Sequence, residues 1–312
     1  MEDKPLISVV LPTYNGSEFI SQAINSIINQ TYTNWELIIV NDCSTDNTAE
    51  IIQTFAQKDS RIRVLTNEVN KKLPASLNVG FKQAQGEYYT WTSDDNEYYP
   101  QAFEKMVDFL QNNDDYGMVH AICRVEGCVE KCCWGYIATT PITLLEFPTV
   151  AACFLYKASI AKSVGNYDES CFYMEDHDFW LRFLLNAPIG IIPEELYMYR
   201  RHEASLTVKS GDIAAKKRLL LTLKYLPSYK ENFPQSEDML NYKYGLLEVI
   251  NNEDDINYEI LKKQFSTKTV YKQLKQIYKL KKSNWQLKRI KSLGFIYFLK
   301  AVELKYKYGV EK

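Results

Sequence analysis

Residues 7–15, Ile-Ser-Val-Val-Leu-Pro-Thr-Tyr-Asn, decide the fold. The first five form a short apolar run that ends at Pro12, which is typical of a strand buried on both faces. Ser17 follows at a position suited to a helix cap, and apolar residues then recur at helical spacing. The stretch therefore predicts a buried strand over residues 7–11, a polar turn, and a helix capped by Ser17.

The same alternation continues to residue 91. Short apolar runs predict strands at 37–40 and 62–65, and the Tyr- and Thr-rich stretch at 87–91 predicts another. Periodic segments predict helices at 49–55 and 73–84. Strands separated by helices of about a dozen residues pair in parallel through right-handed crossovers. The predicted fold class is therefore α/β, with a mostly parallel sheet flanked by helices.

The second half of the chain changes character. The pattern becomes mixed α/β, with a last strand at 197–200, and then helical. Residues 261–312 carry 15 Lys and Arg against two acidic residues, whereas the whole chain has a net charge of −2. We therefore predict one domain over residues 1–210 and a helical, basic region over 211–312.

Composition narrows the class of protein. The 312 residues are 46% apolar and 24% charged, as in a soluble globular chain, and the net charge of −2 does not favour a nucleic-acid-binding protein. The charged start does not resemble a signal peptide, and no run approaches the roughly 18 apolar residues that span a bilayer. Seven cysteines, an odd number, are expected to stay reduced. We expect a cytoplasmic protein.

Two adjacent carboxylates, Asp94 and Asp95, follow the strand at 87–91. Ligands bind outside the carboxyl ends of parallel strands, and paired carboxylates repel each other unless a cation neutralises them. Mg²⁺ or Mn²⁺, shared with substrate phosphates, is the usual cation. The alternative is an Asp-rich turn without a ligand.

A third carboxylate, Asp42, stands at the end of the strand at 37–40. Ser44, Thr45 or Asp46 is expected to cap the next helix, but that role does not need Asp42. A carboxylate at this position can accept a hydrogen bond from a uracil N–H or a ribose hydroxyl.

Two further groups lie in the second half. Residues 175–178, Glu-Asp-His-Asp, begin a helix, where acids suit the macrodipole, but one of them could instead act as a general base. His202 follows two arginines directly after the last predicted strand. A lone histidine is more often structural, yet this setting suits a diphosphate or its metal ion.

Six blocks together carry a family resemblance: residues 7–15, 41–46, 84–88, 92–96, 175–176 and 199–202. In order and spacing they resemble the family 2 glycosyltransferases, which have the Rossmann-like GT-A fold, over roughly residues 5–206. The Ser-Asp-Asp-Asn variant of the fourth block is similar to the branch that contains the spore-coat polysaccharide transferase.

The resemblance implies a role for each matching residue. Contacts to uridine are implied for Pro12, Thr13, Tyr14, Asn15 and Glu18. Asp42 would read the base, and Asp94 would bind the ribose. Asp95 would bind the metal ion, His202 would reach the metal ion or the diphosphate, and Asp176 would be the catalytic base. This sequence departs from the family pattern twice. Ser93 replaces the first Asp of the Asp-x-Asp motif, and Leu77 replaces a common arginine, so that Lys72 would supply the cation.

The implied activity is inverting, metal-dependent transfer of a sugar from a nucleotide sugar, with UDP favoured, to a glycan or lipid-linked acceptor in surface polysaccharide synthesis. Mn²⁺ or Mg²⁺ is the implied cofactor. The alternatives are a non-catalytic domain that binds nucleotide sugars or glycans, and a sugar-1-phosphate nucleotidyltransferase, which would need a Gly-rich loop after the first strand. A Rossmann dehydrogenase is excluded because the chain lacks a GxGxxG motif.

Two other features stay open. Four cysteines, at 123, 128, 132 and 133, could form a zinc site, although paired CxxC spacing is missing and ordinary thiols are favoured. In the basic region, apolar residues recur at helical spacing from Ile290 to Tyr308. This helix is expected either to pack on the protein or a partner, or to dock on an anionic membrane, which would place the protein on the inner face of the cytoplasmic membrane.

Overall fold

The computed structural model describes residues 4–126 and 132–237. The chain divides into two compact units, residues 1–218 and 219–312. The domain boundary expected near residue 210 stays a prediction. The basic helix expected between Ile290 and Tyr308 lies outside the described residues, so both of its interpretations stay open.

One nine-stranded sheet organises the first unit, in the order β3-β2-β1-β4-β8-β6-β9-β5, with β7 paired to β6. The first four strands along the chain are β1 (Ile7–Thr13), β2 (Trp35–Asn41), β3 (Ile62–Thr66) and β4 (Tyr88–Trp91). All pairings among these four are parallel, as the sequence predicts. Every residue of β1 and β2 is buried, which explains their continuous apolar runs.

The rest of the sheet is mixed. It consists of β5 (Glu97–Tyr98), β6 (Met118–Glu126), β7 (Cys132–Trp134), β8 (Cys153–Lys157) and β9 (Ile189–Arg200). Strand β8 runs antiparallel to β4 and β6, β7 antiparallel to β6 and β5 antiparallel to β9, whereas β9 is parallel to β6. The parallel arrangement is therefore confined to the first four strands and to β6–β9. The predicted strand at 197–200 is only the end of β9, because Pro193 and two glutamates interrupt its apolar pattern.

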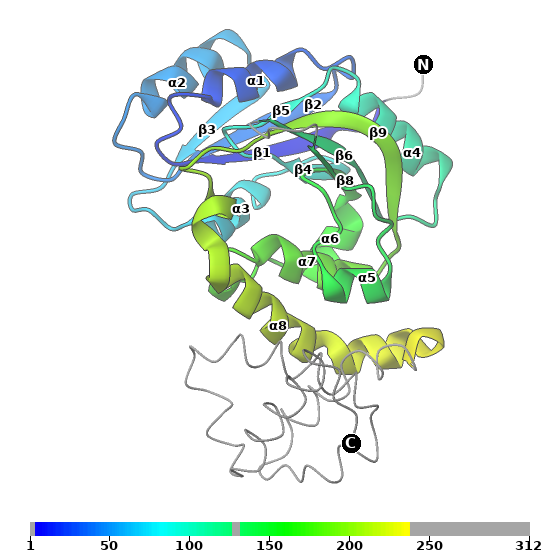
Figure 1. Ribbon diagram of the computed structural model, residues 1–312. Coiled ribbons are helices and arrows are strands. Elements are labelled where there is room, and N and C mark those ends of the chain that lie inside the picture. The colour runs from blue at the N-terminus through cyan, green and yellow to red at the C-terminus, as the bar shows by residue number, and fades with distance from the viewer. Residues whose placement is uncertain (1–3, 127–131, 238–312) are drawn as a thin grey trace, which may run out of the picture. The chain divides into compact units, whose positions relative to one another are not determined.

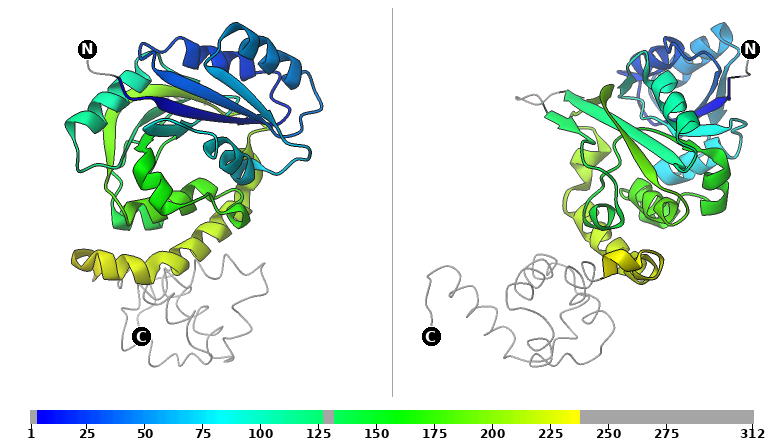
Figure 2. Two further views of the ribbon diagram at one scale, coloured as in Figure 1. Left: turned by 180° about the vertical axis from the view of Figure 1, so that it is seen from behind. Right: turned by 90° about the vertical axis from the view of Figure 1, so that its right-hand side faces the viewer.

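Helices cover both faces of the sheet (Figure 1). One face packs against α1 (Ile20–Ile28), α2 (Thr48–Lys58) and α4 (Ala102–Asn112), and the main hydrophobic core lies between them and the sheet. The other face is covered by α3 (Leu73–Phe81), α6 (Ala158–Val164) and α7 (Glu175–Leu184), as the rear and side views also show (Figure 2). The remaining helices are α5 (Pro141–Glu146), η1 (Glu169–Cys171), α8 (Leu206–Asn232) and η2 (Pro234–Ser236).

Helix α3 packs closely on β1, and local backbone features set its first residue. A Cβ on Gly80 would lie 2.4 Å from Cγ1 of Val10 in β1, so only glycine permits this approach of helix to strand. Pro74 in the first turn and the left-handed backbone of Lys72, with φ of 73°, define the start of the helix. The loop before α3 is thereby held beside the carboxyl end of β2.

The predicted cap of the first helix is wrong. Helix α1 begins at Ile20, its preceding residue is Phe19, and no side chain caps it. The backbone N–H of Ser17 instead donates to Asp46 Oδ2 at 3.2 Å, and a turn that closes on Gly16 occupies residues 16–19. The cap expected from Ser44, Thr45 or Asp46 is also wrong, because α2 follows Asn47 without a side-chain cap, although Asp46 Oδ1 accepts from Thr48 N at 3.1 Å in the turn before the helix.

Across residues 4–126 and 132–237, no helix combines the length and apolar character needed to cross a bilayer.

Candidate functional site

The polar strand ends meet at one edge of the sheet, as the parallel arrangement predicts. Thr13 lies in register with Asn41 of β2, and its hydroxyl donates to Asp94 Oδ2 at 2.5 Å. Asn15 accepts from Thr45 N at 2.8 Å through Oδ1, and its own N–H donates to Ser44 Oγ at 3.0 Å. Hydrogen bonds therefore join the loops after β1, β2 and β4 into one rim.

The loop after β1 presents side chains outward at this rim. Tyr14 is 50% exposed, and Asn15 has a left-handed backbone with φ of 56°. Glu18 is exposed as well, whereas Pro12 is buried within β1 and can only position the loop. Of the five residues expected to contact uridine, Tyr14, Asn15 and Glu18 are thus accessible to a ligand.

The carboxylate of Asp42 accepts several hydrogen bonds from within the protein. The carboxylate is 4% exposed and accepts from Asn67 Nδ2 at 2.8 Å, from Lys71 N at 2.8 Å and from Lys72 N at 2.9 Å. A carboxylate has about four acceptor positions, so one remains for a ligand. Asp42 therefore shapes the loop before α3 in addition to any contact with a base.

The two departures from the family pattern differ in their surroundings. Leu77, at the position of the common arginine, is fully buried in α3. The backbone of Lys72 is bound to Asp42, and its side chain is exposed. Lys72 can therefore supply a cation near this edge of the sheet, and Leu77 cannot.

Asp94 faces the loop after β1. Besides the hydroxyl of Thr13, its carboxylate adjoins Gly16, where a Cβ would lie 2.1 Å from Oδ2. Burial raises the pKa of Asp94 to about 6, and the Asp95 carboxylate adds to this rise, although the hydrogen bond from Thr13 opposes it. Glycine at position 16 is thus the condition for this contact, a role that the sequence motif alone does not reveal.

Asp95 turns the other way and pairs with His202. Nε2 of His202 lies 3.0 Å from Asp95 Oδ2, whereas Asp95 Oδ1 is buried and has no hydrogen-bond partner. Burial raises the pKa of Asp95, although the hydrogen bond from His202 opposes this rise. An unpartnered carboxylate oxygen beside an imidazole fits a divalent cation, which takes one or two protein ligands plus phosphate oxygens.

The guanidinium of Arg200 is hydrogen-bonded to protein groups and is not available to a ligand. It donates to Asp95 O at 2.8 Å, to Gln22 Oε1 and Glu97 Oε1 at 2.9 Å, and to Glu126 Oε2 at 3.1 Å. Arg201, by contrast, is exposed. Of the two arginines before His202, therefore, only Arg201 is accessible to a diphosphate.

Glu175, which is buried, and Asp176, which is half-buried, are adjacent at the start of α7. Glu175 is 5% exposed and its Oε2 has no partner, whereas Asp176 Oδ1 accepts from His177 N at 2.6 Å. Burial raises the pKa of both groups, and repulsion from Asp176 raises that of Glu175 further. The pair therefore favours a single proton, and the partnerless Oε2 of Glu175 is the better place for it.

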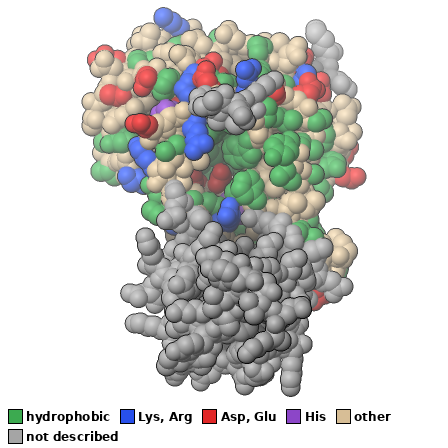
Figure 3. All heavy atoms as spheres, viewed as in Figure 1, with side chains coloured by type: hydrophobic (Ala, Val, Ile, Leu, Met, Phe, Trp, Pro, Cys, Tyr) green, Lys and Arg blue, Asp and Glu red, His purple; other side chains and the backbone are tan. Residues whose placement is uncertain are grey.

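Asp95 and Asp176 lie on different elements, after β4 and at the start of α7 respectively. Burial raises the pKa of Tyr199, the hydrogen bond with Thr207 opposes this rise, and the charges of Asp95 and Asp176 add to it. On the face seen in Figure 3, acidic and basic side chains and a histidine lie beside a broad hydrophobic area. That the metal ligand and the base lie in one site stays a prediction.

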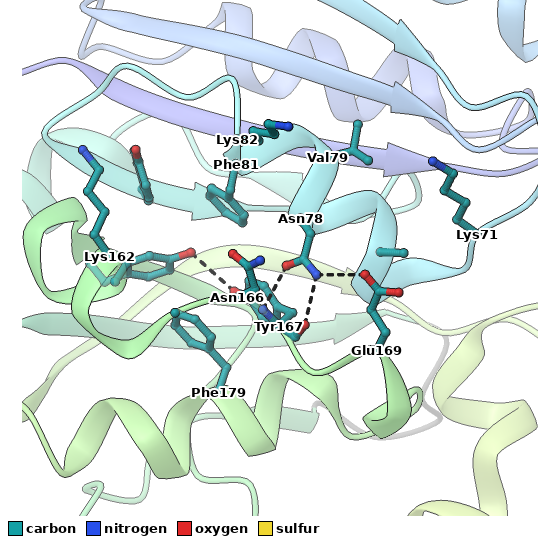
Figure 4. Close-up of a pocket in the computed structure, with 15 residues that line it drawn as sticks. Lys71, Asn78, Val79, Phe81, Lys82, Lys162, Asn166, Tyr167, Glu169 and Phe179 are labelled. Atoms are coloured by element: carbon teal, nitrogen blue, oxygen red, sulfur yellow. Dashed lines mark hydrogen bonds between the residues drawn. The ribbon is translucent and has the colours of Figure 1, made fainter.

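A cavity of about 710 Å³ lies between α3 and residues 161–169. Asn78 of α3 bridges it, accepting from Tyr167 N at 2.9 Å and donating to Tyr167 O at 3.0 Å (Figure 4). The ring of Tyr167 in turn stacks on Phe179 of α7, with centroids 4.4 Å apart. These contacts hold the segment that leads into α7, and so they position Asp176.

Sequence patterns also missed a second cluster of ligand-type side chains. Within the described residues, Asp168, Cys171 and Asp178 bring their ligand atoms within 4.8 Å of one another. Asp178 accepts from Arg182 and Asp168 accepts from Ser170, so protein donors already serve both carboxylates. The zinc interpretation of the other cysteines stays open, because Cys128 lies outside the described residues.

The carboxylate of Asp46 links the turn after β1 to the start of α2, and its contribution to stability can be measured. The carboxylate accepts from the backbone of Ser17 and Thr48 and from the Thr48 hydroxyl; although burial opposes them, these bonds lower the pKa to about 2. Asp46 therefore stabilises the fold above its ordinary pKa near 4, and this contribution disappears as the pH falls toward 2. We expect Asp46→Ala to lower the free energy of unfolding by about 1 kcal/mol at pH 7.

Urea denaturation at several pH values between 7 and 3 measures this effect. The difference between Asp46→Ala and the wild type should shrink toward acid pH, whereas Asp115→Ala, at an exposed position after α4, should show no such trend. A difference that stays constant down to pH 3 would contradict the role of the Asp46 carboxylate.

Comparison with known proteins adds to this geometry. The model of the family described as Glycosyl transferase family 2 matches residues 8–163. A glycosyltransferase of Rickettsia typhi is 33% identical over 215 residues, which are 65% of this chain and 66% of that protein. The glycosyltransferase EpsE of Bacillus subtilis is 31% identical over 224 residues, 70% of this chain and 78% of EpsE. The chain thus spans just under two thirds of the first relative's length.

Solved structures share the fold. S. aureus TarS 1–349 in complex with UDP-GlcNAc superposes with a TM-score of 0.64 at 19% identity, covering 79% of this chain and 73% of that one. The mannosyltransferase PcManGT of Pyrobaculum calidifontis, in complex with GDP-Man and Mn²⁺, gives a TM-score of 0.56 at 15% identity, covering 99% and 89%. Another crystal structure of S. aureus TarS gives a TM-score of 0.61 at 21% identity, and the match covers 79% of this chain and 44% of that one.

Proposed function

Because the chain belongs to glycosyl transferase family 2, we propose that it transfers a sugar from a nucleotide sugar to a hydroxyl group of a glycan or lipid-linked acceptor. The GT-A fold expected from the sequence is confirmed. The finer proposal is that the donor is a UDP-sugar, that transfer inverts the anomeric centre, and that Mn²⁺ or Mg²⁺ is required.

One observation carries this proposal. The unpartnered Oδ1 of Asp95 lies beside His202 at the edge of the sheet that also holds the loop after β1, and the half-buried Asp176 supplies a carboxylate of raised pKa at the start of α7. A transferase needs these three elements together: a place for the nucleotide, a positive charge for its diphosphate, and a base for the acceptor.

Asp95 and His202 would hold the metal ion. When bound, the ion would supply positive charge for the phosphate oxygens as the bond to the sugar breaks. The side chain of Arg201 is exposed immediately before His202 and can add a second positive charge. A positive charge fixed in advance at the leaving group stabilises the transition state more than the ground state.

Asp176 would act as the general base. In one displacement, the acceptor oxygen bonds to the anomeric carbon, the bond from that carbon to the diphosphate breaks, and the hydroxyl proton passes to Asp176. A single displacement inverts the anomeric centre, whereas retention would need a separate nucleophile. With the shared proton on Glu175, Asp176 stays ionised, and burial makes it a stronger base than an exposed carboxylate.

Support for UDP comes from Asp42, which retains one acceptor position, and from TarS, whose crystal structures contain UDP-GlcNAc and UDP. Support for a role in polysaccharide synthesis comes from a relative named for teichuronic acid biosynthesis, TuaG of Bacillus subtilis, which is 36% identical over 107 residues, 34% of this chain and 42% of TuaG. We further propose an anionic membrane surface as a partner of the basic region between Leu261 and Lys312.

A thermal-shift panel of UDP-, GDP- and dTDP-sugars, each with and without Mn²⁺, tests the donor. Binding to the native state raises the unfolding midpoint, by an amount that grows with the logarithm of the ratio of ligand concentration to dissociation constant. We expect the largest rise with UDP-sugars and only when Mn²⁺ is present. A larger rise with another nucleotide would replace UDP, and no rise with any nucleotide sugar would contradict the proposed function.

A further inference from the structure

Phe19 contacts two side chains at the end of β9: Arg200, the last residue of the strand, and His202, two residues later. The Cζ atom of Arg200 is 4.5 Å from the centre of the Phe19 ring, and the His202 ring centre is 5.3 Å from it at an interplanar angle of 48°. A guanidinium over an aromatic face gains a cation–π attraction, and this attraction grows where water is partly excluded. Arg200 is 14% exposed and His202 is 29% exposed, so both contacts are sheltered.

The same two side chains hold Asp95. His202 Nε2 lies 3.0 Å from the Asp95 carboxylate, and Arg200 Nη1 donates to the Asp95 carbonyl at 2.8 Å. The backbone N–H of Arg200 also donates to Asn96 Oδ1 at 2.8 Å. Asp95 is therefore held by Arg200 and by His202, which is itself the second proposed metal ligand. Both of these side chains contact the ring of Phe19.

The backbone of Phe19 belongs to the loop after β1. The N–H groups of Phe19 and Ile20 donate to the carbonyl of Gly16 at 3.2 and 3.0 Å, and Gly16 packs directly against Asp94. The neighbouring N–H of Ser17 is held by Asp46 at 3.2 Å. A ligand that contacts Tyr14, Asn15 or Asp94 therefore acts on the turn that carries Phe19.

We propose that Phe19 is a positioning residue that couples nucleoside binding in the loop after β1 to cation binding at Asp95 and His202. The identity of the two ligands rests on the proposed function. Phe19 is not proposed to contact the reacting atoms or the Asp95 carboxylate. It acts through its contacts with Arg200 and His202. Coupling of this kind is reciprocal: the nucleoside strengthens cation binding by the factor by which the cation strengthens nucleoside binding.

Uridine is the probe that isolates this coupling. A nucleoside diphosphate contacts the cation through its own phosphates, so coupling measured with UDP contains a direct contribution. Uridine has no phosphate, and any effect of uridine on cation affinity must pass through the protein. Mn²⁺ is the matching cation probe, because free Mn²⁺ is measured directly by electron paramagnetic resonance.

The experiment measures the dissociation constant of Mn²⁺ for the full chain with and without saturating uridine. In the wild type, we expect uridine to strengthen Mn²⁺ binding about fivefold or more. Phe19→Leu keeps much of the volume but removes the ring, and it should abolish this effect. Phe19→Tyr restores the ring and should keep it. The matched control is Phe109→Leu in α4, whose ring contacts Tyr116 at 5.4 Å and which should behave as the wild type does.

Three results would overturn the inference: no effect of uridine in the wild type, an unchanged effect in Phe19→Leu, or equal loss in Phe19→Leu and Phe19→Tyr. Binding of UDP to the wild type, measured in parallel, separates this failure from that of the proposed function. If UDP binds together with Mn²⁺ but the uridine effect is absent, only the role of Phe19 fails. If neither UDP nor Mn²⁺ binds, the proposed function fails and the inference fails with it.

Discussion

Asp176→Asn should lower kcat by about 10²- to 10⁴-fold and leave donor binding almost unchanged. The amide keeps the shape of the side chain and can still accept from His177 N, now 2.6 Å from Asp176 Oδ1, but it cannot take a proton from the acceptor hydroxyl. The measurement combines initial rates with the dissociation constant of UDP in the presence of Mn²⁺. A large loss of kcat with unchanged UDP affinity is the expected result.

Substitution of the adjacent residue, Glu175→Gln, shows which of the two carboxylates is the base. The shared proton is expected on Glu175, so a neutral glutamine reproduces its charge, and kcat should fall far less than in Asp176→Asn. Asp108→Asn, at an exposed position of α4, should leave the rate unchanged. Near-normal turnover of Asp176→Asn, or a larger loss in Glu175→Gln, would place the base elsewhere.

Asp95→Asn should abolish the response to metal and lower activity by about 10³-fold or more. The substitution removes the charge that the unpartnered Oδ1 would share with the cation. In the wild type, EDTA should remove activity, and Mn²⁺ or Mg²⁺ should restore it. The measurement is the initial rate as a function of Mn²⁺ concentration for wild type and variant.

The unfolding midpoint of Asp95→Asn shows whether its loss of activity comes from lost metal binding or from misfolding. Asp95→Asn should retain the wild-type unfolding midpoint without ligand but lose the additional stabilisation that Mn²⁺ gives to the UDP complex. Full turnover of the wild type in excess EDTA would contradict the metal role of Asp95 and His202.

Strand ends are the part of the site that a sequence reveals best. Apolar runs locate β1, β2 and β4, and parallel pairing then brings Thr13 and Asp94 to one edge. The start of α7 was also accessible, because three acids in four residues exceed what a helix terminus needs. These features depend on local pattern and on a general rule of sheet topology, and neither requires knowledge of distant contacts.

Contacts between remote segments could not be read in this way. Arg200 binds Gln22, 178 positions earlier in the chain, and its neighbours in sequence suggested a diphosphate ligand. Gly16 has no signal of its own until the carboxylate of Asp94 is seen beside it. The start of α1 differs from expectation because Asp46 captures the Ser17 N–H. In each case the deciding partner lies on another element.

The most direct measurement is a crystal structure of the protein with UDP and Mn²⁺, recorded with the anomalous signal of manganese. The expected map has one anomalous peak within about 2.3 Å of a carboxylate oxygen of Asp95 and in contact with the diphosphate, with the nucleoside against Tyr14 and Asn15. A diphosphate bound at another face, or a manganese peak away from Asp95 and His202, would contradict the proposal that this edge of the sheet binds an activated sugar.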